Sequence, residues 1–516
     1  MSAKKTLVSI LAALGLLIGV LAPTSGAQDG GEAPPPPLAG IGYSPNIGDY
    51  PALAFVLTEY PGNVLRSCTG TLIAPTWVLT AAHCVEHENF SFAVEVTVML
   101  GSIDGDDVFF APGPGVEIHT VAGFLLNGNW SVDTFSDDVA LLKLPVASAK
   151  KPMPIATDAA LVSPANGSPL PATAIGFGQC GASCNDSLLR FGTTEIWSDS
   201  DVTSGVAIPG VPLNVQAITQ QKNLFLAPNV TVGGALCSGD SGGPLIVMQN
   251  GQRRVAGVNS FIVDVPSAND CEGGPDNQYF NGVADIVTSD LASWVSQVTD
   301  AVSQNCWGLP ATLEGTSFLD KIFGTGDADV IHGRGGGDLI VGGEGGDRLC
   351  GGAGPDAIFG EGGSDKIKGN SGSDDLVGGT GADTLDGGKG KDIAHGGGGA
   401  DRLLGGGGND DLFGGNGADN IKGGSGNDDI FGNSGKDTLR GGNGNDTVNG
   451  GKNGDNIFGG PGKDKLTGNS GNDDIFGNSG KDTLTGSKGA DDLDGGRDTD
   501  SCSGGTGSDT KTACES

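Results

Sequence analysis

A nine-residue repeat fills the second half of the chain and constrains its fold more than any other feature. It begins at Gly324 and runs without insertion or deletion to about Thr512, with the pattern G-G-x-G-x-D-x-U-x. The sixth position is aspartate in every repeat, and U is Ile, Leu or Val in nearly all of them, with Ala394 as one exception. Because glycine permits positive φ and close backbone approach, the period predicts short strands joined by tight turns.

This repeat resembles the haemolysin-type (RTX) nonapeptide, which implies a parallel β-roll that binds several calcium ions over residues 318–516. Two repeats would make one coil, so aspartates eighteen residues apart would stack and offer the oxygen ligands that calcium prefers. The alternative of a disordered linker does not explain why aspartate recurs at every ninth residue. A roll that folds without metal is disfavoured, because aliphatic residues are few and stacked carboxylates repel one another.

The expected calcium ligands are the aspartates of the sixth position. They are Asp329, Asp338, Asp347, Asp356, Asp365, Asp374, Asp383, Asp392, Asp401, Asp410, Asp419, Asp428, Asp437, Asp446, Asp455, Asp464, Asp473, Asp482 and Asp491. The sixth position continues as Asp500 and Asp509, but Cys502 and Lys511 at the eighth position mark a fraying end.

The N-terminus has the pattern of a secretory signal peptide. Lys4 and Lys5 precede an apolar run, small residues follow it, and we expect cleavage after Ala27, which assigns residues 1–27 to the signal. A membrane anchor is the alternative, but the run is short and no stop-transfer charges follow. Residues 28–38 form a Pro-rich spacer that would serve as a propeptide. The signal and ten cysteines predict an extracellular protein, and the net charge of −34 argues against nucleic acid as a partner.

Three motifs in the first half point to nucleophilic catalysis. Ser241 stands in a glycine-rich turn, but a lone serine is a weak nucleophile and needs a base. His83 is the candidate base, and Asp138 is the candidate acid that orients it, in competition with Asp137. Their chain order resembles that of the trypsin/chymotrypsin-like serine proteases. The resemblance implies an all-β fold of two packed antiparallel barrels over residues 39–304, joined to the roll by a linker at 305–317.

The resemblance also implies roles for residues around the triad. The backbone N–H groups of Gly239 and Ser241 would form the oxyanion hole. Asp240 and Ser260 would support the triad, Asp240 by pairing with a new N-terminus created by activation. No cofactor is expected for catalysis.

The specificity pocket is inferred from the same resemblance. Ala235 falls at its base, where it offers no carboxylate to hold Lys or Arg, and Ile262 falls on its wall. We therefore expect cleavage after small or medium uncharged residues.

The cysteines fit the same resemblance. Cys68 and Cys84 bracket the histidine as the family's pair does, Cys237 and Cys271 resemble the pair beside the pocket, and the remaining expected pairs are Cys180 with Cys184 and Cys502 with Cys514. Cys306 and Cys350 remain by elimination; if paired, they would pin the end of the protease region to the third repeat.

Together these features favour a secreted serine endopeptidase with a calcium-dependent repeat domain that serves stability, export or surface attachment. Its partners would be a protein or peptide substrate, calcium, and a cell surface or extracellular matrix. The alternative is a non-enzymatic, calcium-dependent adhesion protein with a protease-like head. We further expect calcium to fold residues 318–516, while the head holds together without it.

Overall fold

The computed structural model describes residues 50–62, 64–87, 91–101, 115–130, 138–157, 170–176, 190–196, 224–228, 241–263, 280–285, 289–299 and 304–515. They divide into two compact units. Unit 1 comprises Met1–Val121 with Trp130–Ala292, and unit 2 comprises Ala122–Asn129 with Ser293–Ser516. Apart from one α-helix and one 3-10 turn, the regular elements of the described residues are strands, which confirms the all-β prediction. No helix in the described ranges is long and apolar enough to cross a membrane.

Unit 1 contains two antiparallel sheets, as expected for the two barrels. The first sheet has the order β7-β6-β1-β2-β3-β9. Its strands are β1 (Leu53–Tyr60), β2 (Val64–Ala74), β3 (Trp77–Thr80), β6 (Glu95–Leu100), β7 (Glu117–Thr120) and β9 (Ala140–Lys143), and the short strands β4 (Glu86–His87) and β5 (Ser91–Phe92) pair beside it.

The second sheet has the order β11-β10-β13-β14-β15-β12. Its strands are β10 (Leu170–Gly176), β11 (Arg190–Ile196), β12 (Leu224–Pro228), β13 (Pro244–Gln249), β14 (Gln252–Val263) and β15 (Phe280–Asp285). The helix α5 (Ser289–Thr299) follows and carries residues of both units. Its side chains Leu291, Trp294, Val295 and Val298 are buried, in agreement with their helical spacing in the sequence.

Apolar strands build the core of unit 1. Strand β3 is buried along its whole length, and so is most of β6, because both lie inside a sheet whose faces are covered. The segment that leaves β9 crosses to the second sheet: Met153 N–H donates to the Leu72 carbonyl, and Val255 N–H donates to the Pro154 carbonyl. This segment therefore joins the two sheets through one backbone hydrogen bond to each.

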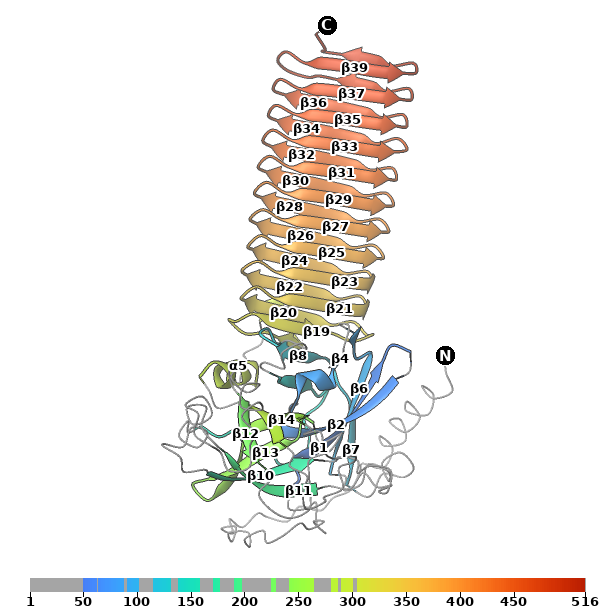
Figure 1. Ribbon diagram of the computed structural model, residues 1–516. Helices are drawn as coiled ribbons and strands as arrows, with labels where there is room; N and C mark the ends of the chain where they lie inside the picture. The colour runs from blue at the N-terminus through green and yellow to red at the C-terminus, as the bar shows by residue number, and fades with distance from the viewer. Residues whose placement is uncertain are drawn as a thin grey trace. The chain divides into compact units, whose positions relative to one another are not determined.

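Unit 2 is a parallel β-roll, in which each strand pairs with the strand eighteen residues further along the chain (Figure 1). One sheet, which we call the odd face, contains β19 (Asp320–Phe323), β21 (Leu339–Gly345), β23 (Ala357–Gly363), β25 (Asp375–Thr380), β27 (Ile393–Gly398), β29 (Asp411–Asn416), β31 (Asp429–Ser434), β33 (Thr447–Lys452), β35 (Lys465–Ser470), β37 (Thr483–Lys488) and β39 (Ser501–Thr506).

The other sheet, the even face, has twelve strands in chain order. They are β18 (Leu313–Glu314), β20 (Val330–Gly335), β22 (Arg348–Ala353), β24 (Lys366–Ser371), β26 (Thr384–Lys389), β28 (Arg402–Gly407), β30 (Asn420–Ser425), β32 (Thr438–Asn443), β34 (Asn456–Pro461), β36 (Asp474–Ser479), β38 (Asp492–Asp494) and β40 (Thr510–Thr512).

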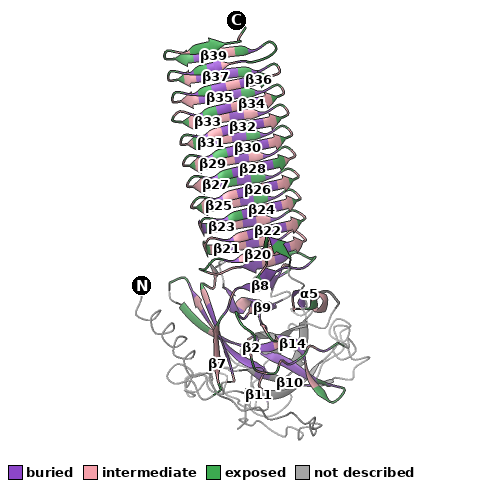
Figure 2. Ribbon diagram, turned by 180° about the vertical axis from the view of Figure 1, so that it is seen from behind, coloured by how far each residue is buried: buried purple, intermediate pink, exposed green. Residues whose placement is uncertain are grey.

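The core of the roll consists of one inward side chain per strand. The series begins with Leu313 and Ile322 and continues with Ile331, Ile340 and Leu349, and each is fully buried. Ala394, the exception in the repeat, occupies the same inward position. Figure 2 shows these positions as a buried band along the roll, with more exposed side chains on either side. The eighth position of the repeat therefore forms the core, as predicted.

The first coil of the roll contains a strand from the middle of the protease region. Strand β8 (Phe124–Asn127) pairs antiparallel with β19, Phe124 stacks on Phe323 with ring centroids 5.0 Å apart, and Gly128 N–H donates to the Leu319 carbonyl. Gly123 approaches so closely that a Cβ there would lie 2.4 Å from a Leu313 methyl group. Strand β8 thus covers the open edge that β19 would otherwise present to solvent.

A hairpin and a disulfide complete this end of unit 2. Strands β16 (Asn305–Cys306) and β17 (Leu309–Pro310) pair antiparallel, and Cys306 is bonded to Cys350. At the other end of the roll, Cys502 is bonded to Cys514.

Candidate active site and calcium repeats

The candidate base and its acid are held together by two hydrogen bonds. His83 lies in the 3-10 turn η2 (Ala82–Cys84) directly after β3, and Asp138 lies two residues before β9. Because β3 pairs with β9, with Thr80 opposite Ala140, the two side chains meet at the same end of the sheet. The Nδ1 of His83 lies 2.7 Å from Oδ2 of Asp138, and the backbone N–H of His83 donates to Oδ1 at 2.9 Å.

This geometry decides which nitrogen of the imidazole is available. Asp138 has no exposed surface, whereas His83 is 19% exposed. An ionised carboxylate only accepts hydrogen bonds, so Nδ1 carries the proton and Nε2 keeps a lone pair for proton transfer. The arrangement can orient a general base and stabilise the imidazolium that forms when the base takes up a proton.

Ser241 is tied by its backbone to the strands that carry His83. Its carbonyl accepts a hydrogen bond of 2.7 Å from Thr69 N–H in β2, and the Thr69 carbonyl in turn accepts one from Oγ1 of Thr80. The next residue, Gly242, has φ +81°, and a Cβ there would lie 2.1 Å from Oγ1 of Thr80. Glycine is required at this position by both its conformation and this close contact. The motif turn therefore packs against β2 and β3.

A disulfide fixes the histidine turn to the same strand. Cys84 is bonded to Cys68, the neighbour of Thr69. Cys68, His83 and Cys84 form the cluster of potential metal-ligating side chains that stands out among the described residues. Because both sulfurs are in the disulfide, they are not thiolates, and this cluster does not have the donors of a metal site.

Several predicted site residues lie outside the described residues. These are the signal peptide and spacer, Asp137, Ala235, Gly239, Asp240, and the cysteines Cys180, Cys184, Cys237 and Cys271. Ser260 and Ile262 lie on β14, but their side chains are likewise outside what the structure describes.

The aspartates of the roll form two buried columns, one for each face. The Oδ1 of each aspartate accepts the backbone N–H of the aspartate eighteen residues earlier; for example, Asp338 N–H donates to Asp356 Oδ1 at 2.9 Å. The second oxygen, Oδ2, is buried without a hydrogen-bond partner in a whole series of these residues. The series is Asp338, Asp347, Asp356, Asp365, Asp374, Asp383, Asp392, Asp401, Asp410, Asp419, Asp428, Asp437, Asp446, Asp455, Asp464, Asp473, Asp482, Asp491 and Asp500.

Backbone oxygens converge on the same places. A Cβ added at Gly333 would lie 2.4 Å from Oδ2 of Asp338 and 2.6 Å from the carbonyl oxygen of Gly351, one coil further on. The same pair of contacts recurs at Gly360, with Asp365 and Gly378. Orphaned carboxylate oxygens beside glycine carbonyls are the hard oxygen donors that suit calcium, so the residues present fit this ion.

The carboxylates of the columns are costly to ionise when no cation is near. Burial, reinforced by the neighbouring Asp320 and Asp356, raises the pKa of Asp338 to about 9. Burial raises the pKa of Asp347 to about 7 and that of Asp356 to about 6. A bound divalent cation would remove this penalty, because it favours the charged form of each ligand.

The first aspartate of each column differs from the later ones in the hydrogen-bond partners of its Oδ2. The Oδ2 of Asp329 accepts hydrogen bonds from the backbone N–H and Oγ1 of Thr325, so this oxygen already has partners. Asp320, which precedes the glycine-rich pattern and was not predicted, is satisfied in the same way by Thr316 and also accepts the indole N–H of Trp294. Its only sequence signal is its position nine residues before Asp329. At the start of each column, a threonine therefore donates to the carboxylate oxygen that has no hydrogen-bond partner further along.

Known protein families match both halves of the chain. The Trypsin family matches residues 42–280. The family described as the RTX calcium-binding nonapeptide repeat (4 copies) matches nine overlapping stretches between residues 314 and 510. A trypsin from Phaedon cochleariae is 31% identical over 229 residues, which cover 43% of this chain and 76% of that protein. The chain belongs to the trypsin family.

Two further matches were found for this trypsin-family chain. Brachyurin from Leptuca pugilator is 29% identical over 242 residues, which cover 46% of this chain and 89% of the relative. A solved structure titled HL collagenase is 24% identical, with 50% of this chain and 96% of that chain covered and a TM-score of 0.36. The trypsin-family half makes the protein a serine endopeptidase that needs no cofactor for catalysis, and its repeats bind calcium.

Proposed function

We propose that this protein is a secreted endopeptidase that cleaves peptide bonds with the triad His83, Asp138 and Ser241. The observation that supports the triad most directly is the pair of hydrogen bonds from His83 to the fully buried Asp138. Ser241 attacks the scissile carbonyl, and Nε2 of His83 takes the hydroxyl proton and later passes it to the leaving amine. Asp138 holds the imidazole in the tautomer that this transfer requires.

The remaining parts of the site follow from the sequence. The N–H groups of Gly239 and Ser241 stabilise the oxyanion, and loss of one such donor typically costs about 3 kcal/mol. Asp240 and Ser260 support the triad. Ala235 and Ile262 line the pocket for the residue before the cut bond, which favours small or medium uncharged side chains.

The test compares two histidines of unit 1, His83 in the turn η2 and His119 in strand β7. His83→Gln removes the base, while His119→Gln removes a histidine that also lies beside a carboxylate, with Nε2 3.3 Å from Oε2 of Glu117. We expect His83→Gln and Ser241→Ala to lose peptidase activity and labelling by a fluorophosphonate probe, and His119→Gln to retain both. Full activity of Ser241→Ala would refute the triad assignment.

We propose that the repeats fold after export, when calcium becomes abundant. Extracellular calcium modules typically bind at about 10⁻⁴–10⁻³ M, so a calcium-poor compartment would leave the repeats unfolded. Such a roll would stabilise the secreted enzyme and offer a surface for attachment to a cell or matrix. N-terminal sequencing of secreted protein tests cleavage after Ala27; a mature protein that begins at Met1 would refute the signal.

A further inference from the structure

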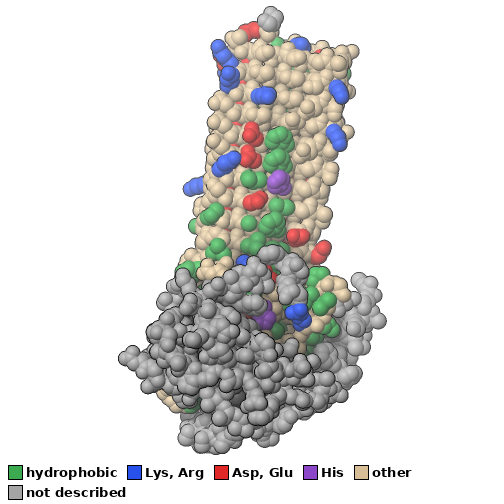
Figure 3. Space-filling view, viewed as in Figure 1, with side chains coloured by type: hydrophobic (Ala, Val, Ile, Leu, Met, Phe, Trp, Pro, Cys, Tyr) green, Lys and Arg blue, Asp and Glu red, His purple; other side chains and the backbone are tan. Residues whose placement is uncertain are grey.

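The two faces of the roll carry opposite chemistry on their outward side chains. On the odd face, strands β21 to β31 present mainly apolar residues, with three aspartates and one histidine. In chain order the outward residues are Leu339, Val341, Ala357, Phe359, Asp375, Val377, Ile393, His395, Asp411, Phe413, Asp429 and Phe431. Figure 3 shows a continuous band of hydrophobic side chains on this face, with acidic side chains beside it. We call it the odd-face stripe.

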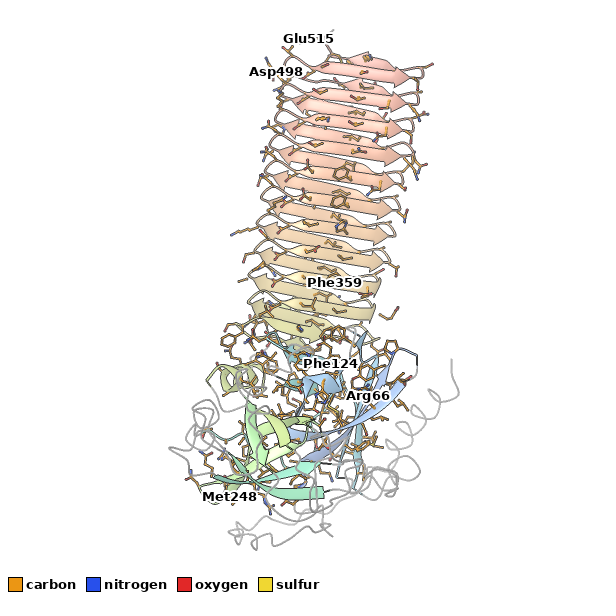
Figure 4. All side chains as sticks on the ribbon, in the orientation of Figure 1. Arg66, Phe124, Met248, Phe359, Asp498 and Glu515 are labelled. Carbon is orange, nitrogen blue, oxygen red and sulfur yellow. A yellow bond between two sulfur atoms is a disulfide. The ribbon has the colours of Figure 1, made fainter. Side chains whose placement is uncertain are left out.

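Aromatic rings give the stripe a regular spacing. His395 stacks on Phe413 with ring centroids 4.5 Å apart, and Phe413 stacks on Phe431 at 5.1 Å. Phe413 and Phe431 remain partly exposed despite this stacking, and His395 is exposed. Phe359, which Figure 4 labels, lies on the same face on β23, two strands before β27. Over strands β27, β29 and β31 the stripe is therefore an ordered stack of rings that repeats with the strand spacing.

The even face carries a row of cations over the corresponding strands. The basic residues are Arg348, Lys366, Lys368, Arg402, Lys422 and Arg440. Some have neighbours of their own: Lys368 pairs with Asp386 at 3.5 Å, and Arg440 lies over the ring of Phe458. Arg402 and Lys422 are exposed. In a chain of net charge −34, such a row is a marked local reversal of sign.

We propose that the odd-face stripe of one molecule docks on the even-face cationic row of a second copy. Asp375 and Asp429 of the stripe attract the cations, whereas Asp411 already pairs with Lys391 of its own chain at 2.8 Å. The long aliphatic stems of Lys and Arg cover the phenylalanines while their heads stay hydrated. A second copy is favoured over an unrelated cationic polypeptide because both faces repeat at the same strand spacing, so the contacts coincide on every rung. Because the strand spacing is constant, the second copy can shift along the roll by a whole number of strands. It can therefore avoid the β16–β17 hairpin, which is bonded to Cys350 through Cys306.

The surface available is sufficient for a specific contact. Six strands about 4.8 Å apart and about 20 Å long cover roughly 600 Å² on each copy. The two copies together exceed the roughly 1,000 Å² that a specific interface needs. Since different faces meet, the contact is heterologous and adds copies side by side rather than closing a symmetric dimer. Calcium favours it by neutralising the carboxylate columns inside the roll.

Paired charge reversals test the proposal in the full-length Ser241→Ala protein, which cannot digest itself, with calcium present. Variant A carries Asp375→Lys and Asp429→Lys on the odd face. Variant B carries Arg402→Glu and Lys422→Glu on the even face. All four positions are exposed, so circular dichroism should show an unchanged roll. Sedimentation velocity then measures the association of each variant and of their equimolar mixture.

We expect wild type to associate, A and B each to associate at least about tenfold more weakly, and the mixture to recover the wild-type strength. The mixture recovers because the reversed odd face of A meets the reversed even face of B. Phe413→Thr with Phe431→Thr should also weaken association, while Phe476→Thr alone, on strand β36 of the even face and beyond the cationic row, should not. Threonine fits positions 413 and 431 because Thr467 and Thr485 already occupy the equivalent positions further along the odd face.

Three results would overturn the proposal. A wild-type protein that stays monomeric at about 100 µM has no such contact. A mixture no stronger than A or B alone excludes complementary faces. Undiminished association of B would show that the stripe meets its own copy instead, because the odd face of B is wild type.

Discussion

The indole Nε1–H of Trp130 donates a hydrogen bond of 2.6 Å to Oε2 of Glu86, and both side chains are buried. Glu86 follows His83 by three residues, and Trp130 precedes the stretch that leads to Asp138. The bond therefore connects the chain just after the candidate base, His83, to the chain just before its candidate acid, Asp138. It lies within unit 1, although residues 122–129 immediately before Trp130 belong to unit 2.

We expect Trp130→Phe to destabilise unit 1 by about 1–3 kcal/mol, because a buried carboxylate loses a donor while the ring volume is largely kept. The value of kcat should fall more than KM rises, since the change displaces His83 rather than the substrate pocket. Trp307→Phe is the matched control, because the buried Nε1 of Trp307 has no hydrogen-bond partner among the described residues. Equal melting temperatures for the two variants would contradict the role of the Glu86 bond.

A second prediction concerns the acid of the triad. Asp138→Asn should lower kcat by roughly 10⁴-fold with little change in the fold, because asparagine favours the wrong imidazole tautomer. Steady-state kinetics on a peptide substrate measure this change. Asp137→Asn is the control for position, and we expect it to keep near wild-type activity. A larger loss from Asp137→Asn than from Asp138→Asn would exchange the two assignments.

The roll should respond to pH in opposite directions with and without calcium. In the metal-free protein the carboxyl groups have raised pKa values, about 9 for Asp338 and about 7 for Asp347, compared with about 4 when unfolded. Each such group stabilises the fold below its unfolded pKa, and this contribution is lost as pH rises through the folded pKa. In chelator, the strand signal in circular dichroism should fall between about pH 4 and pH 9.

With calcium the trend should reverse, because only ionised carboxylates bind the cation and protons compete with it. The measurement is a circular dichroism titration of the full-length Ser241→Ala protein at several pH values, with magnesium as the control ion. A metal-free roll that becomes more ordered as pH rises would contradict the burial of these carboxyl groups.

Single aspartates should differ in their effect on calcium affinity. Asp356→Asn removes an orphaned oxygen but keeps an acceptor for Asp338 N–H, so the fold is retained and the calcium titration midpoint should rise. Asp329→Asn should change it less, because Thr325 already satisfies Oδ2 of Asp329. Isothermal titration calorimetry would distinguish the two. Identical effects would mean that Thr325 gives way to the cation when calcium binds.

The roll was largely predictable because its pairing repeats. Once the nine-residue phase is read, Ile331 must stack on Leu349, and Asp338 must approach Asp356. The same periodicity explains what was missed: Asp320 is in phase but lies before the glycine pattern begins, so no turn signal marks it. The pairing of His83 with Asp138 has a different basis, since short motifs surround both residues and the two side chains meet in the structure.

Strand β8 could not be predicted as part of the roll. Phe124-Leu125-Leu126-Asn127 reads as an ordinary apolar strand, and its partner β19 lies far downstream with no shared motif. Trp294 is a buried residue of α5, but it also donates to Asp320 of the roll. Both pairings depend on long-range packing, which leaves no local pattern in either segment.

The origin of β8 limits how such a protein could be assembled from modules. A gene fragment that begins at Asp320, just before the first repeat, would encode β19 with an open edge, and a fragment that ends with α5 would leave Phe124 without its stacking partner. The repeats are therefore not a cassette that can be moved unchanged to another enzyme. During synthesis, β8 emerges long before the strand it pairs with, so a chaperone or the export machinery would have to protect Phe124 until the repeats arrive.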